Sequence, residues 1–157
     1  MRIEEKLHAA FLKSQKTLAL AESCTGGAMA SALTAIPGAS HFLLGSLVVY
    51  SNTWKEEFLG VSPRTLQTKG AVSAEVVEEM VRGLFHRTQC DFAAAVSGIA
   101  GPSGGTSEKP VGTIFIAIGK RGDFMDVQRL QAPKDRRGAI AFAVETTFEA
   151  LLKQVHS

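Results

Sequence analysis

The sequence predicts an α/β fold, a three-layer α/β/α domain built on a mostly parallel, mixed sheet of about five strands. Apolar segments of strand length alternate with amphipathic segments of helical periodicity, which is typical of parallel sheets covered by helices on both faces. Near the end of the chain two strand-like segments follow one another across a short turn, so one strand should run antiparallel to the others. The 157 residues include no linker-like stretch, which predicts a single domain over 1–157.

The N-terminal half should alternate helices with strands. Ile3, Leu7 and Phe11 recur at helical spacing. Short apolar runs indicate buried strands, and the alanine-rich stretch after two adjacent glycines favours a helix, as does the segment after the capping residues Ser51 and Asn52. These patterns place helices at 3–12, 28–33 and 53–59, a turn at 36–40, and buried strands at 17–21 and 45–50.

The C-terminal half should begin with a helix that Ser73 caps, with Val76, Met80 and Leu84 on one face. A buried strand at 92–96 then leads into a long glycine-rich loop. Two strands at 111–118 and 124–130, joined by a turn at 120–123, and a final helix from about Lys134 or Asp135 to about Lys153 complete the chain.

Composition argues against several classes of protein. The net charge is only +2 and the basic residues are scattered, so nucleic acid is not an expected partner. No apolar run approaches the roughly 18 residues of a membrane span, and the charged N-terminus lacks the apolar core of a signal peptide. Two cysteines do not make a disulfide framework, and no cluster has metal-ligand spacing. We therefore expect a cytoplasmic protein without a membrane partner or a metal site.

Polar residues and glycines gather after three predicted strands, at 22–27, 50–55 and 97–106. Because ligands bind at the carboxyl ends of strands in open α/β sheets, these loops should line one shared pocket. Ser23 lies just before a helix start, where backbone N–H groups can stabilise an oxyanion, and this suits a nucleophile. The competing interpretation is that Ser23 only caps the helix, which is the commoner role of a single serine in this position.

A serine nucleophile needs a base, and the histidines are poorly placed for that role. His8 and His86 fall on predicted helix surfaces, His41 in a turn and His156 in the terminal tail. Lys55 is better placed, one turn into a short helix, because a lysine in a dry pocket can have its pKa lowered enough to accept a proton. Tyr50 would relay the proton or orient the lysine. Taken singly, a solvated lysine and a core tyrosine are the commoner roles.

Cys24 is a rival nucleophile beside Ser23. A helix N-terminus or a neighbouring cation would favour its thiolate. No histidine partner is expected near it, and a small buried packing residue is the commoner role of such a cysteine.

The glycine-rich loop suggests an anion site, although it lacks the Gly-Lys-Ser/Thr ending of a phosphate-binding P-loop. Its backbone N–H groups would form an anion nest. Arg136 and Arg137, with Lys134, are candidate partners for a phosphate, because a guanidinium binds phosphate through two N–H groups at once.

Five motifs follow one another along the chain. They are Ala21-Glu22-Ser23-Cys24-Thr25-Gly26-Gly27, Tyr50-Ser51-Asn52 with Lys55, Gly70-Ala71-Val72-Ser73, the loop 97–106, and Lys109-Pro110-Val111-Gly112-Thr113. In this order they resemble the CinA C-terminal domain family, which includes stand-alone nicotinamide-nucleotide amidases. The resemblance covers about residues 17–113 and extends more weakly to the C-terminus. Some larger members carry a further N-terminal domain, which we do not expect in a chain of 157 residues.

The resemblance implies that nicotinamide mononucleotide is hydrolysed to nicotinate mononucleotide and ammonia, in pyridine-nucleotide recycling and without a metal or organic cofactor. It implies a Ser23 nucleophile assisted by Lys55 and Tyr50, with the N–H groups of the 24–27 turn holding the oxyanion. The residues expected to bind substrate are Cys24, Thr25, Gly26, Gly27, Asn52, Ser97, Gly98, Gly101, Gly105, Thr106, Arg136 and Arg137. A homo-oligomer of two or more copies is also implied.

The chain departs from the family pattern at two places. The family usually has threonine where this chain has Ser97, which keeps the hydroxyl. It commonly has Gly-Asp-Arg followed four residues later by arginine, whereas here Asp135, Arg136 and Arg137 are followed by Ile140. Which of the two arginines meets the phosphate is therefore open. Two other functions also stay open: a catalytically silent module that binds a pyridine nucleotide or docks a partner, and an amidase for another small amide.

Overall fold

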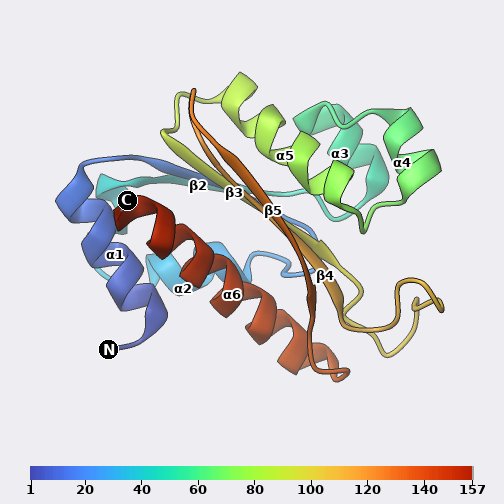
Figure 1. The fold of residues 1–157 in the computed structure, drawn as a ribbon. Helices are drawn as coiled ribbons and strands as arrows, with labels where there is room; N and C mark the ends of the chain where they lie inside the picture. The colour runs from blue at the N-terminus through green and yellow to red at the C-terminus, as the bar shows by residue number, and fades with distance from the viewer. Residues whose placement is uncertain (157) are drawn as a thin grey trace.

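The computed structural model describes residues 1–156, and it places a five-stranded sheet between two groups of helices (Figure 1). The strands are β1 (Leu18–Glu22), β2 (Leu43–Val48), β3 (Phe92–Gly98), β4 (Thr113–Lys120) and β5 (Met125–Gln131). The helices are α1 (Ile3–Ser14), α2 (Ala28–Thr34), α3 (Asn52–Leu59), α4 (Pro63–Lys69), α5 (Ala74–Arg87) and α6 (Arg136–His156), with a short 3₁₀ helix η1 (Ala39–His41). The predicted fold class is confirmed.

The sheet has the strand order β2-β1-β3-β4-β5. β1 is parallel to both β2 and β3, whereas β4 is antiparallel to β3 and to β5. Within the described chain, β4 is therefore the one strand that runs against the others, as the predicted hairpin required. Glu22 at the end of β1 lies opposite Val48 in β2 and Val96 in β3, so these three strands end at the same edge of the sheet.

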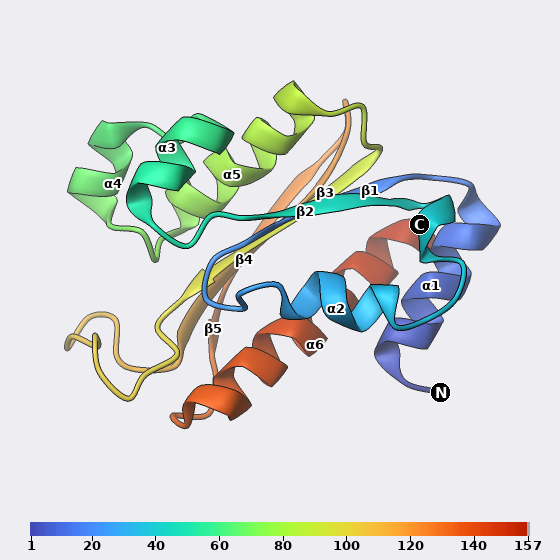
Figure 2. The same cartoon turned by 180° about the vertical axis from the view of Figure 1, so that it is seen from behind.

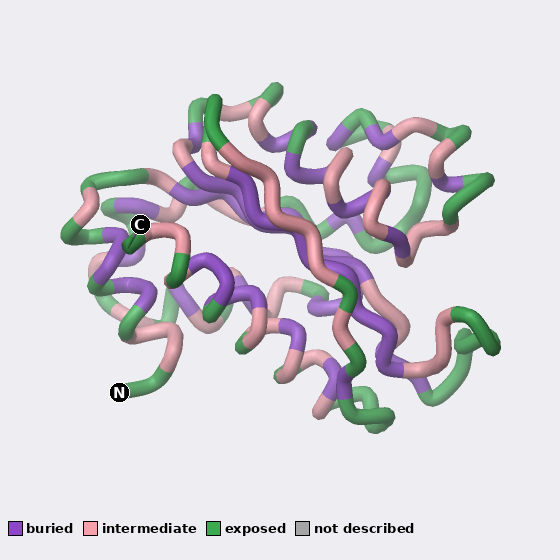
Figure 3. The backbone as a smooth tube through the Cα atoms, in the orientation of Figure 1, coloured by how far each residue is buried: buried purple, intermediate pink, exposed green. Residues whose placement is uncertain are grey.

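Helices cover both faces of the sheet because the central strands are apolar on both sides. Leu18 and Leu20 of β1 face a core that α1, α2 and α6 cover, whereas Ala19 and Ala21 face a second core under α3, α4 and α5 (Figures 1 and 2). All five residues of β1 are buried, and Figure 3 shows the buried trace running through the centre of the sheet. A strand buried on both faces has a continuous apolar sequence rather than an alternating one.

The prediction that the second strand is buried was wrong. β2 forms an edge of the sheet with β1 as its one neighbour, and Figure 2 shows this edge from the outside. Its side chains are half-buried or exposed, and Leu44 is 54% exposed. A short apolar run is typical of both central and edge strands, and the position in the sheet depends on distant segments of the chain.

Helix α4 was not predicted, although its start carries a recognisable signal. Ser62 precedes Pro63, and proline is favoured in the first turn of a helix, where its missing N–H is not needed. The helix has seven residues with Leu66 as its buried residue, so its apolar periodicity is too short to stand out.

His8 was predicted to lie on a helix surface and is instead buried. Its ring meets Phe42 edge to face with centroids 5.2 Å apart, and the turn at Gly38 closes over it. The buried face of α1 is thus wider than its leucine and phenylalanine positions suggest. None of the helices formed by residues 1–156 combines the length and the apolar character that a membrane crossing requires.

Candidate active site

The candidate active site lies where β1, β2 and β3 end. Ser23 directly follows β1, Ser97 belongs to β3, and Lys55 lies one turn into α3, which begins shortly after β2. A cavity of about 180 Å³ brings the three side chains together. It is lined by Ser23, Cys24, Tyr50, Lys55, Ala71, Val72, Ser97, Gly98, Ala100 and Arg136. Ala71, Val72 and Ala100 were not predicted as site residues. They belong to the motifs at 70–73 and 97–106, but their apolar side chains gave no reason to select them.

Lys55 and Ser23 are in direct contact inside this cavity. Lys55 Nζ donates a hydrogen bond to Ser23 Oγ at 2.9 Å and to the carbonyl oxygens of Val49 and Tyr50 at 2.9 and 3.0 Å. Lys55 is only 1% exposed, and within residues 1–156 no carboxylate forms an ion pair with it. Loss of hydration therefore lowers the pKa of Lys55 from 10.5 to about 8, although the neighbouring Cys24 opposes this in part. A neutral amine beside the serine hydroxyl can accept its proton.

Helix α3 aims Lys55 into the cavity. Ser51 caps the helix, with its hydroxyl accepting a hydrogen bond from the Trp54 N–H at 3.1 Å, and Gly60 ends the helix in a left-handed conformation. Lys55 and Leu59 are four residues apart and are both buried, so they share the face that packs inward. Lys55 was predicted from its position shortly after a strand end. The inward-packed face of α3 explains why a lysine at this position reaches the cavity.

The turn that carries Ser23 is closed by a residue that sequence reasoning did not select. The carboxylate of Glu22 accepts hydrogen bonds from Thr25 Oγ1 at 2.7 Å and from the Gly27 N–H at 3.2 Å. The N-cap residue of α2 is Gly27, not Ser23. The interpretation of Ser23 as a helix cap was therefore wrong. The signal available in the sequence was a carboxylate directly after a buried apolar strand, where a charge is expensive unless it is bonded.

The backbone N–H groups of this turn are not all available to an oxyanion. The Gly26 N–H donates to the Ser23 carbonyl and the Gly27 N–H donates to Glu22. Within the described chain, the N–H groups of Cys24 and Thr25 donate to no other residue. The whole 24–27 turn was expected to hold an oxyanion. The N–H groups that remain available for this are those of Cys24 and Thr25.

Tyr50 has two separate contacts in the site. Its main-chain carbonyl oxygen accepts a hydrogen bond from Lys55 Nζ, a contact that does not depend on the tyrosine side chain. Its side chain is 61% exposed, and its hydroxyl accepts a hydrogen bond from Arg136 Nη2 at 3.3 Å rather than meeting Ser23 or Lys55. The structure thus shows no path for a proton from Ser23 through the tyrosine hydroxyl.

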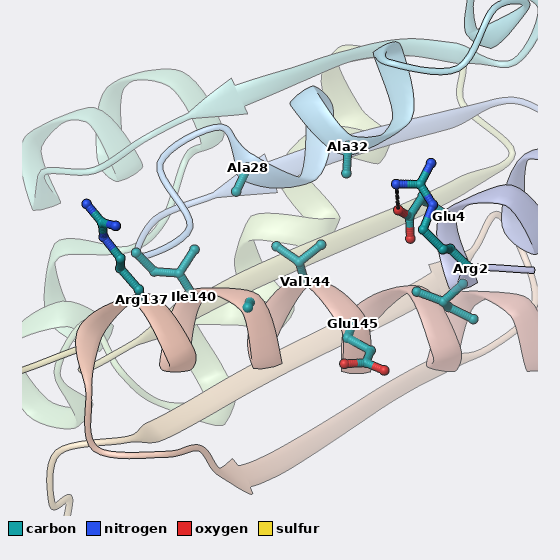
Figure 4. A pocket seen from close by; sticks show the side chains of 10 residues that line it. Arg2, Glu4, Ala28, Ala32, Arg137, Ile140, Val144 and Glu145 are labelled. Carbon is teal, nitrogen blue, oxygen red and sulfur yellow. Dashed lines mark ion pairs between the residues drawn. The ribbon is translucent and has the colours of Figure 1, made fainter.

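The two arginines at the start of α6 point to different places. Arg136 lines the Ser23 cavity, and its Nη1 donates to the Gly101 carbonyl at 2.8 Å. Arg137 instead lines a groove of about 590 Å³ between α1, α2 and α6, together with Ile140 and Val144 (Figure 4). Successive residues of a helix are rotated by about 100°, so only one of the pair can face the cavity.

Cys24 lines the cavity but is not poised as a nucleophile. It is buried, and loss of hydration raises the pKa of its thiol to about 11. The thiol is therefore protonated at neutral pH. A side chain on Gly98 would collide with Ile114 Cδ1 and would begin 3.0 Å from the Thr113 carbonyl oxygen and 3.2 Å from Cys24 Sγ, which explains the glycine at that position.

The glycine-rich loop forms a second hollow beside the first. Its volume is about 430 Å³, and its lining residues are Pro102, Ser103, Gly104, Gly105, Thr106, Pro110, Val111 and Lys134. The single pocket that the sequence predicted is thus divided in two, with the Gly101 carbonyl and Arg136 between them. Of the predicted binding residues, Gly105 and Thr106 lie in this second hollow. Those that line neither cavity are Thr25, Gly26, Gly27, Asn52, Gly101 and Arg137.

Ser97 has a structural contact at the edge of the site. The Ser97 hydroxyl donates to the Ala71 carbonyl at 2.9 Å, which ties β3 to the segment before α5. In the part of the chain that the structure describes, no three His, Cys, Asp or Glu residues are grouped so that they could hold a metal ion.

Comparison with known sequences gives a consistent result. Residues 1–155 match the model of the CinA C-terminal domain. The CinA-like protein of Shewanella amazonensis (strain ATCC BAA-1098 / SB2B) is 48% identical over 138 residues, which are 88% of this chain and 32% of that protein. The CinA-like protein of Thermotoga sp. (strain RQ2) is 51% identical over 117 residues, 74% of this chain and 29% of that protein. The chain thus spans about a third of the length of these curated relatives.

Solved structures share the fold over nearly the whole chain. The competence/damage inducible protein CihA from Agrobacterium tumefaciens is 36% identical with a TM-score of 0.93, covering 99% of this chain and 96% of its own. A CinA superfamily protein from Klebsiella pneumoniae 700603 is 34% identical with a TM-score of 0.93, covering 98% and 96%. From the matched domain, the identities and the shared fold we conclude that the chain belongs to the CinA C-terminal domain family.

Proposed function

We propose that this protein hydrolyses the carboxamide of nicotinamide mononucleotide to nicotinate mononucleotide and ammonia, as part of cytoplasmic pyridine-nucleotide recycling. The observation that carries the proposal is the 2.9 Å contact between Lys55 Nζ and Ser23 Oγ inside the cavity that both residues line. A nucleophile within hydrogen-bond reach of its base is the arrangement that covalent catalysis requires. The family includes amidases, and the resemblance of the motifs directs the proposal to this substrate.

The reaction would proceed through an ester on Ser23. Lys55 Nζ takes the hydroxyl proton as Ser23 Oγ bonds to the carboxamide carbon, and the N–H groups of Cys24 and Thr25 stabilise the oxyanion. Lys55 then returns the proton to the leaving nitrogen, the C–N bond breaks and ammonia departs. A water molecule, deprotonated by Lys55, cleaves the ester, which releases the nicotinate carboxylate and restores Ser23.

Arg136 would meet the phosphate of the substrate. Its guanidinium uses only two of its five N–H groups, for the Gly101 carbonyl and the Tyr50 hydroxyl, which leaves donors at the mouth of the cavity. The second hollow, with Lys134 and the hydroxyls of Ser103 and Thr106, offers cationic and polar partners for the ribose phosphate. A buried lysine without a carboxylate partner argues against a silent binding module, because burial of its charge has no structural benefit.

A substrate panel tests this proposal. Ammonia release would be measured from nicotinamide mononucleotide, nicotinamide riboside, free nicotinamide and glutamine, with the acid product identified for each. We expect the mononucleotide to have the highest kcat/KM and to yield nicotinate mononucleotide and ammonia in equal amounts. Equal activity on the riboside, which lacks the phosphate, would refute the proposed contact between Arg136 and the phosphate. Tight binding of the mononucleotide without turnover would instead identify a silent module.

A further inference from the structure

Glu22 is the most deeply buried charged group beside the candidate active site. It is 0% exposed, it immediately precedes Ser23, and within residues 1–156 no cation pairs with it. Glutamate is almost never fully buried unless its oxygens are bonded. The carboxylate therefore has to be held by neutral donors, and identifying these donors shows what Glu22 organises.

Five donors surround the carboxylate, and most of them belong to the segment that follows Ser23. Oε1 accepts from Thr25 Oγ1 at 2.7 Å, Gly27 N at 3.2 Å and Met29 N at 2.9 Å, and Oε2 accepts from Ala30 N at 3.2 Å and Ser46 Oγ at 2.8 Å. The turn and the first residues of α2 thus wrap around one side chain. A helix start is ordinarily held by one hydrogen bond to a nearby capping serine or aspartate. Here the acceptor is instead a buried carboxylate at the end of β1, which is costly to bury.

The wrapped turn places Ser23 on the side of the cavity. Ser23 and Cys24 lie between Glu22 and Thr25, which are bonded to one another, and both intervening residues line the cavity. The Ser23 N–H also donates to the Val96 carbonyl of β3 at 3.1 Å. The backbone of Ser23 is therefore held from the neighbouring strand, while the Glu22 carboxylate holds the chain that leaves it.

We propose that Glu22 is a positioning residue, whose carboxylate holds the turn so that Ser23 Oγ meets Lys55 and the Cys24 N–H stays free. This inference rests on the proposed role of Ser23 as the nucleophile. Misplacement of a reacting group by about 1 Å lowers rates by about 100-fold, so the loss of this template should act on kcat. Substrate contacts in the rest of the cavity stay in place, so KM should change little.

Three substitutions separate positioning from simple stability. Glu22→Gln keeps the shape but offers one acceptor oxygen, Thr25→Val removes a bond inside the turn, and Ser46→Ala removes a bond that reaches the same carboxylate from β2. We expect kcat to fall about 100-fold in Glu22→Gln and about 10-fold in Thr25→Val, with KM within about threefold of wild type. Ser46→Ala is the matched control and should keep kcat within about twofold. The pH at which kcat/KM reaches half its plateau should not move, because Lys55 is intact.

A second readout makes the test independent of the substrate. A fluorophosphonate labels activated serines, and intact-mass measurement at Ser23 gives its rate in each variant. Slowed labelling in Glu22→Gln and Thr25→Val, with normal labelling in Ser46→Ala, supports positioning. If Glu22→Gln does not fold, the comparison of Thr25→Val with Ser46→Ala is sufficient. Wild-type kcat and labelling in Thr25→Val, or equal losses in Thr25→Val and Ser46→Ala, would overturn it.

The two proposals fail in different ways. Labelling of wild-type Ser23 without turnover of nicotinamide mononucleotide would refute the substrate, while the labelling rates still decide the role of Glu22. If wild type shows neither labelling nor turnover, the nucleophile itself is refuted, and the role of Glu22 falls with it.

Discussion

Burial has opposite chemical consequences for Cys24 and Lys55, which both lie beside Ser23 in the cavity. Loss of hydration disfavours whichever form is charged, so it raises the pKa of the Cys24 thiol to about 11 and lowers the pKa of Lys55 to about 8. Both groups are thereby shifted toward neutrality. For the cysteine, neutrality removes the nucleophile, and for the lysine it creates a base. Burial in this one cavity therefore favours Ser23 over Cys24 as the proposed nucleophile.

The pKa of Lys55 predicts how activity depends on pH. Below about pH 8 the amine is protonated and cannot accept the Ser23 proton, so kcat/KM should fall about tenfold per pH unit and reach a plateau above that value. Initial rates measured between pH 6 and 10 would show the inflection. Lys55→Met should lose about 100- to 10,000-fold in kcat. A flat profile, or a Lys55→Met variant with wild-type rates, would exclude Lys55 as the base.

The same shift predicts a change in stability with pH. Between about pH 8 and 10.5 the unfolded chain holds a proton on Lys55 that the folded protein has released. The contribution of this residue to the free energy of unfolding should therefore rise with pH across that window. Lys55→Met should remove that rise when the two proteins are unfolded by urea at pH 7.5 and 10.

At the residue scale, sequence reasoning identified the groups with obvious chemistry and missed those that depend on orientation. Ser23 and Lys55 were found because strand ends and a short helix are local features. The choice between Arg136 and Arg137 depends on the rotation of α6 against the sheet, which only long-range packing sets. Glu22 was overlooked because most of its partners are backbone N–H groups of the following turn and of α2, and the sequence does not show where a turn brings such groups.

At the scale of elements, the packing of α3 on α5 sets the position of Lys55, the proposed base. A side chain on Gly83 of α5 would collide with the backbone of Leu59, at the end of the helix that carries Lys55. The glycine therefore permits the two helices to approach closely. Because the obstructing group is backbone rather than a flexible side chain, α3 would have to shift to accommodate a larger residue.

Gly83→Ala should consequently destabilise the protein and impair catalysis together. We expect a loss of about 1–3 kcal/mol in the free energy of unfolding, despite the better helix propensity of alanine, and a reduced kcat because Lys55 is displaced. Urea unfolding and steady-state kinetics measure the two effects. Arg82→Ala, next to it on the exposed face, breaks an exposed ion pair with Glu78 and should cost less than about 1 kcal/mol. Equal stability of Gly83→Ala and wild type would show that α3 and α5 do not constrain each other.

The elements themselves were predictable to different degrees for physical reasons. Helix α5 has a long apolar face and a serine cap, so both its existence and its start followed from the pattern. Helix α4 buries one side chain and leaves too weak a pattern. The edge position of β2 was not predictable, since strand order is decided by which distant strands pair with β1.

For the whole molecule, the layers and the direction of the strands followed from the order of the elements, and the division of the pocket did not. The three strand ends do meet at one edge, as parallel pairing demands. The glycine-rich loop encloses its own hollow, and Arg136 bonds to the Gly101 carbonyl within this loop. Such a contact joins residues 35 positions apart and has no signature in either segment.

A homo-oligomer remains a prediction of the family resemblance, and the surface of the molecule suggests where to test it. Exposed large apolar side chains are concentrated on the edge strand and the helix after it, at Leu44, Leu47, Val48, Tyr50, Trp54 and Phe58. An uncharged edge strand is a template for pairing with another copy. Sedimentation velocity should show a dimer or larger species that Leu47→Lys dissociates, whereas Leu12→Lys on α1 should not. A monomeric wild type at all concentrations would contradict the prediction.

Ser23, and not Cys24, is the nucleophile in the proposed reaction. Ammonia release from nicotinamide mononucleotide by wild type, Ser23→Ala and Cys24→Ala, compared at one pH above 8, tests this directly. We expect kcat to fall more than about 1,000-fold in Ser23→Ala and to stay within about tenfold of wild type in Cys24→Ala. Full activity in Ser23→Ala, or a loss confined to Cys24→Ala, would contradict it.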